Sequence, residues 1–143
     1  MSDAARRILL AILLIGTIGI TVELLLLGHD EDFNQLIPLA MSAATLITGV
    51  LISVKPGVGT VRLFQVVAVL LIGSGALGMY FHFRATSEFQ LEMDPSLAGW
   101  ALFRKAILAK APPALAPGAM TQLGLIALAC TFRHPALQSG RKP

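Results

Sequence analysis

The sequence predicts an all-α integral membrane protein with four transmembrane helices, both termini in the cytoplasm, and a short amphipathic helix in the outer loop between the third and fourth transmembrane helices. Two observations predict this fold class. Of the 143 residues, 55% are hydrophobic and 13% are charged, and the mean hydropathy is +0.76, so water is not the solvent for most of the chain. The apolar residues also gather into four runs, each about as long as the roughly 20 residues of helix that cross a bilayer.

The runs predict helices over residues 8–27, 36–54, 63–83 and 114–132 of a single domain that covers 1–143. Each run is apolar on every side, whereas the strands of a membrane barrel alternate apolar and polar residues. Helices also satisfy their own backbone hydrogen bonds in lipid. The first run is too long for a signal peptide and has no small-residue cleavage signature after it, so we expect it to be retained.

The distribution of Lys and Arg predicts the orientation, because short loops rich in these residues stay in the cytoplasm. The loop over 29–32 has neither, and the mixed loop over 84–110 falls outside by parity. The prediction is a bacterial inner (plasma) membrane protein with both termini inside, and the net charge of +3 is a topology signal with no sign of a nucleic-acid partner. The cytoplasmic basic residues are Arg6, Arg7, Lys55, Arg62, Arg133, Arg141 and Lys142.

The outer loop between the third and fourth runs predicts an interfacial helix over about 95–110. Asp94 before Pro95 is a helix start signal, since proline is well tolerated at the first helical position. Trp100 would lie at headgroup depth. A lid or a partner-docking surface stays open as an alternative. The predicted apolar face consists of Leu97, Trp100, Ala101, Phe103, Ile107 and Leu108, and Pro112, Pro113 and Pro117 then give a bent lead into the fourth helix.

Small residues at helical spacing predict where helices pack, because they let backbones approach closely in lipid. We expect Gly16 and Gly19 to share with Glu23 a face that looks into the bundle. The G-x-G-x-x-G pattern over 73–78 lies inside an apolar run without the strand that a dinucleotide site needs, so packing explains it. The predicted packing residues are Gly16, Gly19, Thr45, Gly49, Ser74 and Gly78.

Four polar residues form the candidate site. Glu23 lies about 24 Å along its helix from Arg7, close to the outer interface, and a carboxylate in a span is costly unless it is paired. His82 and Arg84 end the third run on the same side, and His29 begins the first outer loop. Two hypotheses follow. In the first, Glu23 reaches water or pairs with Arg84 and locks two helices. In the second, these four residues line an outward-facing pocket for a ligand, a proton or a small cation.

The remaining chemistry is sparse. Cys130 is the one cysteine, and no metal site or cofactor is predicted from the spacing of His, Cys, Asp and Glu. Enzymes rank last because no paired catalytic groups share a face. The expected function is a non-enzymatic membrane subunit or scaffold that assembles with itself or with a membrane-protein partner in the lipid bilayer. The alternative is a small proton- or cation-coupled transporter or channel that uses Glu23 and His82.

Overall fold

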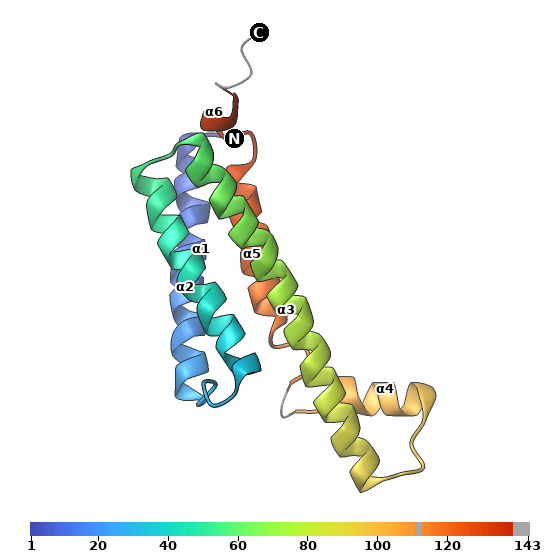
Figure 1. Ribbon diagram of the computed structural model, residues 1–143. Coiled ribbons are helices and arrows are strands. Elements are labelled where there is room, and N and C mark those ends of the chain that lie inside the picture. Colours follow the sequence, from blue (N-terminus) through green and yellow to red (C-terminus); the bar gives the residue numbers. More distant parts are fainter. Residues whose placement is uncertain (111–112, 139–143) are drawn as a thin grey trace. The chain divides into compact units, whose positions relative to one another are not determined.

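The computed structural model describes residues 1–110 and 113–138 (Figure 1); Pro112, Arg141 and Lys142 lie outside them. This part of the chain is all-α. It divides into two compact units: unit 1 comprises Met1–Ser74 with the chain from Met120 onward, and unit 2 comprises Gly75–Ala119. The helices are α1 (Asp3–Leu26), α2 (Phe33–Val54), α3 (Val58–Met93), α4 (Gly99–Ile107), α5 (Gly118–Thr131) and α6 (Pro135–Gln138).

Three of these helices are long and apolar enough to cross a membrane, judged by length and composition. They are α1 with 24 residues, α2 with 22 and α3 with 36, whereas the apolar helix α5 has 14. Their lengths suggest an integral membrane protein, as the sequence predicted. The fourth crossing and the orientation stay predictions.

Both amino-terminal helices begin at capping groups that precede the apolar runs. The Ser2 hydroxyl accepts a hydrogen bond from the Ala5 N–H at 3.3 Å, so α1 starts five residues before the predicted position. At the start of α2, the Gln35 side-chain oxygen accepts hydrogen bonds from the N–H groups of Glu31 and Asp32 at 2.9 and 3.1 Å. The capping residues are polar, so hydropathy alone placed these starts too late.

The α3 helix runs ten residues past the predicted end at residue 83. The added segment is amphiphilic, and an ion pair at 2.8 Å between Arg84 and Glu88, one turn apart, stabilises it. A helix can continue into water when such pairs and good helix formers support it. The end of the apolar run is therefore not the end of the helix.

The α4 helix begins at Gly99, four residues later than predicted. The Asp94 carboxylate accepts hydrogen bonds from the backbone N–H and the hydroxyl of Ser96, at 3.1 and 2.6 Å, and so closes a turn before any helix forms. Gly99 itself has a φ of +52°, which favours glycine. The predicted start at Pro95 is wrong because Asp94 caps a turn.

The α5 helix begins at Gly118 rather than at residue 114, and residues 114–117 form a turn. Pro117 has no N–H and disfavours the helical region for Ala116. Backbone hydrogen bonds to the carbonyls of Pro113, Leu115 and Ala116, at 3.2, 2.9 and 3.2 Å, hold this turn together.

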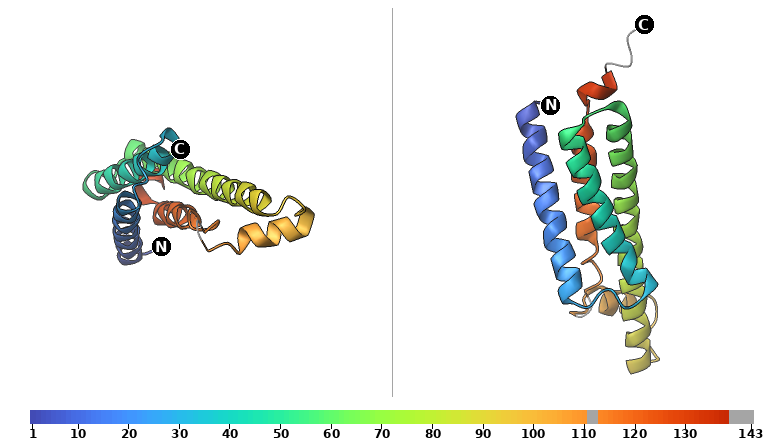
Figure 2. Two further views of the ribbon diagram at one scale, coloured as in Figure 1. Left: turned by 90° about the horizontal axis from the view of Figure 1, so that it is seen from below. Right: turned by 60° about the vertical axis from the view of Figure 1, so that its left-hand side comes forward.

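Unit 1 contains the main core, formed by α1, α2 and the portions of α3 and α5 that belong to it (Figure 2). Gly124 of α5 makes the closest approach, since a Cβ there would lie 2.8 Å from the Ala68 carbonyl oxygen and 3.1 Å from the Ile72 nitrogen. The Gln65 side chain also donates a hydrogen bond to the Thr131 hydroxyl at 3.1 Å. The buried cluster consists of Leu13, Ile52, Val61, Phe64, Ala68, Leu71, Met120, Leu123, Ala127 and Cys130.

Candidate functional site

Glu23 lies on α1 one turn before the helix ends, and its side chain is exposed. Gly19, one turn earlier, is also exposed. Apart from its two chain neighbours and the adjacent backbone of α1, no atom lies within 4 Å of the position that a Cβ would take. Gly16 differs, because a Cβ there would lie 2.9 Å from Leu123 Cδ2. The face that was expected to look into the bundle is thus covered at the depth of Gly16 and open at Gly19 and Glu23.

His29 follows the carboxyl end of α1 and is half-buried. Gly28 has a φ of +63°, and its N–H bonds to the Leu25 carbonyl at 3.1 Å. The His29 N–H bonds to the Leu24 carbonyl at 2.9 Å. These two bonds are the Schellman arrangement that satisfies the last carbonyls of a helix, so the backbone of His29 has a structural role.

His82 and Arg84 belong to unit 2, and the structure gives each a local partner. The Nδ1 atom of His82 lies 3.2 Å from the carbonyl oxygen of Pro113. The guanidinium of Arg84 pairs with Glu88, and both of these side chains are more than half exposed, at 61% and 58%. The pairing of Glu23 with Arg84, and the pocket that they would share with His82, stay predictions.

The other predicted packing residues occupy varied surroundings. A Cβ at Gly49 would lie 2.8 Å from Leu14 Cδ2, and one at Gly78 would lie 2.8 Å from Pro117 Cβ. Thr45 is buried with its hydroxyl bonded to the Met41 carbonyl of its own helix at 2.8 Å, and Ser74 is half-buried. The role of these residues in helix association remains a prediction.

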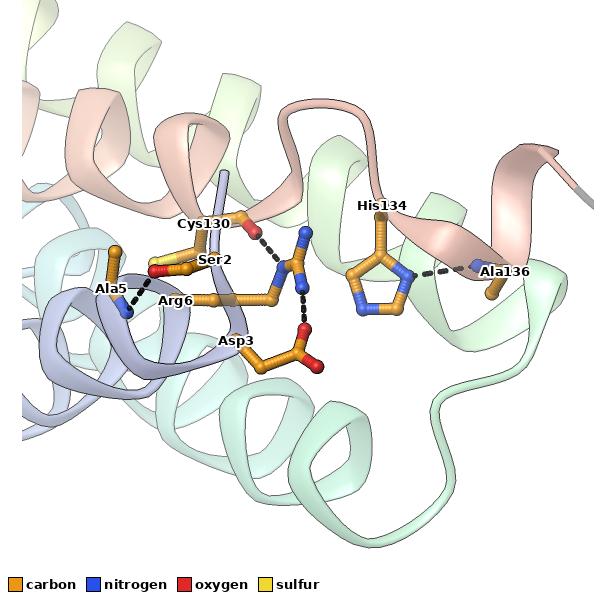
Figure 3. A network of polar contacts seen from close by, with 7 residues as sticks. All are labelled: Ser2, Asp3, Ala5, Arg6, Cys130, His134 and Ala136. Carbon is orange, nitrogen blue, oxygen red and sulfur yellow. Dashed lines mark hydrogen bonds and ion pairs between the residues drawn. The ribbon is translucent and has the colours of Figure 1, made fainter.

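A polar cluster in unit 1 joins the start of α1 to the end of α5, and sequence reasoning did not find it (Figure 3). The Arg6 Nε donates a hydrogen bond to the Cys130 carbonyl at 3.0 Å, and its Nη1 pairs with Asp3 at 2.7 Å. Only 13% of the Arg6 side chain is exposed. His134 is buried nearby, and its Nδ1 accepts a hydrogen bond from the Ala136 N–H at 3.2 Å. We call Asp3, Arg6, Cys130 and His134 the Arg6 cluster.

The Arg6 cluster places a positive charge and a hydrogen-bond donor at the carboxyl end of α5. The last carbonyls of a helix have no partner within it, and the carboxyl end carries a partial negative charge that a guanidinium complements. Burial lowers the pKa of His134, the positive charge of Arg6 lowers it further, and Asp3 opposes them. The neutral imidazole is therefore favoured, which suits a ring nitrogen that accepts the Ala136 N–H.

The orientation rule contains the one signal that could have pointed to this cluster. It places Arg6 and the end of the fourth helix at the same membrane face. It does not say which carbonyl the guanidinium reaches, because that depends on how the helices pack. Cys130, for its part, is buried in the core of unit 1.

Within residues 1–110 and 113–138, no three His, Cys, Asp or Glu side chains are grouped so that they could hold a metal ion. No protein-family model, curated protein or solved structure matches the chain.

Proposed function

We propose that this protein is a non-enzymatic membrane subunit that assembles with itself or with another membrane protein through the open face of α1. The observation that carries the proposal is the exposure of Glu23 together with Gly19, one turn apart on an apolar helix. Large apolar side chains surround this pair on the same helix, among them Ile15 at 72% exposure and Leu26 at 82%.

Glu23 supplies the reason for a partner. A carboxylate that faces lipid is unfavourable, by roughly 2.5–3.5 kcal/mol for Asp at the bilayer centre and by less toward the interface. A hydrogen-bond donor on a neighbouring helix would remove this cost. Because Glu23 is one turn from the helix end, water can meet part of the need, so the partner has to offer close packing as well.

Gly19 supplies that packing. Small residues let a second helix approach closely, and the association of helices in lipid depends on such approach. Gly16 is filled by Leu123 of the same chain, whereas the space beside Gly19 is empty. A second helix at Gly19 would be within reach of the carboxylate of Glu23.

The mass of the particle tests the proposal. The tagged protein is extracted from its own membrane in polymer-bounded lipid discs. We expect the protein in each disc, without the lipid and polymer, to have a native mass above the 15.1 kDa of one chain. Gly19→Leu should shift the particle toward one chain, since leucine fills the open face. Gly73→Leu is the matched control, because Gly73 of α3 is also exposed with nothing within 4 Å.

Either of two results contradicts the proposal: a wild-type particle that holds one chain alone, or Gly19→Leu and Gly73→Leu particles of equal mass. Glu23→Gln separates assembly from the transporter alternative. The amide keeps a hydrogen-bonding group, so assembly should persist with a modest loss of stability. Loss of proton or cation flux in liposomes, with an unchanged particle, would favour the alternative.

A further inference from the structure

An aromatic stack in unit 2 ties α4 to one level of α3. The ring of Phe103 lies 5.6 Å from the ring of Phe83, measured between centroids, and the ring of Trp100 stacks on Phe103 at 5.1 Å with 21° between the planes. We call Phe83, Phe103 and Trp100 the aromatic stack. Phe83 belongs to α3, and the other two belong to α4.

The sequence gives the depth of Phe83. The apolar run over 63–83 would be about 31 Å long as a helix, which matches a bilayer core of about 30 Å. Arg62 and Arg84 bound this run, so Phe83 falls where hydrocarbon gives way to headgroups. The aromatic stack therefore holds α4 at the level of the interface.

The direction of α4 agrees with this depth. Within unit 2, α4 runs across the end portion of α3 rather than alongside it (Figure 1). If α3 crosses the bilayer, α4 lies close to the membrane plane. Ala106 is fully buried on its protein side, whereas Trp100 is 74% exposed and Leu108 68%. An exposed indole one helical turn from a basic residue, here Arg104, is typical of a helix that lies in the headgroup region.

The charges of α4 indicate what covers the exposed face. Arg104, one turn after Trp100, is exposed, and Lys105 lies 3.7 Å from the carboxylate of Asp94. The helix carries no acidic residue. A guanidinium fits a phosphate, and an indole fits the glycerol region below it.

We propose that the aromatic stack and Arg104 form a phospholipid-contact site that seats α4 in the headgroup region of the leaflet nearest Phe83. The occupant is the bilayer itself, with a lipid phosphate at Arg104 and the glycerol region against Trp100. This proposal depends on membrane insertion and not on the assembly proposed above.

Trp100 is the single tryptophan of the chain, so its fluorescence tests the proposal directly. The protein is reconstituted in phosphatidylcholine and phosphatidylglycerol vesicles that contain lipids brominated either near the glycerol or deep in the acyl chain. We expect the shallow bromines to quench Trp100 more than the deep ones, and iodide in water to quench it weakly. In the Arg104→Gln variant, quenching of Trp100 by iodide should rise about twofold. Adding inorganic phosphate to the wild type should leave the quenching of Trp100 by iodide unchanged.

The matched control moves the reporter along α3. In the double variant Trp100→Phe with Met93→Trp, the indole sits at the last residue of α3, about 15 Å beyond Phe83. We expect strong quenching by iodide and none by brominated lipid there. Circular dichroism checks that the helices are retained.

Three results would overturn the proposal. Strong iodide quenching of Trp100 without bromine quenching would place α4 in water. Protection from both quenchers would mean that a second copy or another protein covers it. Equal quenching by brominated lipid at positions 93 and 100 would contradict the membrane depth that Phe83 assigns to α4.

Discussion

Arg6 and Cys130, 124 positions apart in the chain, are joined by a hydrogen bond of 3.0 Å from the guanidinium Nε to the backbone carbonyl oxygen. The first turn of α1 thus caps the last turn of α5 in unit 1. Replacing a guanidinium at such a cap leaves a buried carbonyl without its partner, which costs more than the bond itself is worth.

Arg6→Met should lower the free energy of unfolding by roughly 1.5–3 kcal/mol, the range for hydrogen bonds to charged groups. Methionine keeps much of the apolar stem, so the loss reports on the guanidinium. The melting temperature in detergent measures it. Arg7→Met is the control, because Arg7 is the exposed neighbour in sequence. Equal melting temperatures for the two variants would assign no stability to the cap.

His134 should make stability depend on pH. Its pKa is lowered in the folded chain, first by burial and then by Arg6, so the folded state binds fewer protons than the unfolded state. The contribution is full above the ordinary histidine pKa of about 6.5 and is lost as pH falls through the lowered value. Protonation of Nδ1 would also break the bond from the Ala136 N–H.

We therefore expect the melting temperature to fall between about pH 8 and about pH 5, and to fall less in His134→Gln, which does not titrate. A His29→Gln variant controls for a histidine outside the Arg6 cluster. Parallel pH profiles for wild type and His134→Gln would exclude His134 as the source of the dependence.

Glycine substitutions should rank by what a new methyl group meets. Gly124→Ala should lose roughly 1–3 kcal/mol, because its Cβ would press on backbone atoms of α3 that cannot move away. Gly49→Ala should lose less, since the obstacle is the end of the Leu14 side chain. Gly73→Ala, in open space, should gain up to about 1 kcal/mol of helix propensity. Melting temperatures in the reverse order would contradict this ranking.

The larger change to leucine should be unfavourable at both Gly49 and Gly78, by roughly one to a few kcal/mol through overpacking. Thermal unfolding in detergent measures the loss. If both variants melted at the wild-type temperature, these two glycines would face lipid.

Labelling from the outer face tests the orientation. In a Cys130→Ala background, a membrane-impermeant maleimide should modify Glu31→Cys and spare Gly57→Cys, since the acidic loop is predicted outside and the Lys55 loop inside. The contact of Arg6 with Cys130 puts the start of α1 and the end of α5 at the same end of unit 1, and the labelling decides which side of the membrane that end faces. Modification of Gly57→Cys alone would show that the orientation is the opposite of the predicted one.

Hydropathy predicted the three long helices because an apolar run of spanning length has few alternatives in lipid. It missed their polar ends. The ten residues of α3 after Phe83 include the ion pair of Arg84 and Glu88, which supports a helix but lowers the hydropathy of the segment. The start of α4 was predicted too early because Asp94 can cap either a helix or a turn. In the structure its carboxylate accepts the Ser96 N–H and closes a turn.

The Arg6 cluster could not be predicted, for a different reason. Which carbonyl Arg6 reaches depends on the depth and rotation at which α5 packs, and the close approach of Gly124 to Ala68 and Ile72 is part of that packing. The same packing leaves Gly16 covered and Gly19 open, although the two glycines are one helical turn apart in sequence. Periodicity assigns residues to a face but not the extent to which a neighbour covers it.

The short length of α5 bears on how the protein enters its membrane. A helix of 14 residues is about 21 Å long, less than the bilayer core of about 30 Å, so it is a weak insertion signal by itself. Its polar groups find their acceptors and donors on α3, where Thr121 bonds to the Ile72 carbonyl at 3.3 Å and Gln65 bonds to Thr131. If α5 is the fourth crossing that the sequence predicts, α3, which is synthesised before it, would serve as a template for its insertion, and the order of synthesis would then set the order of folding.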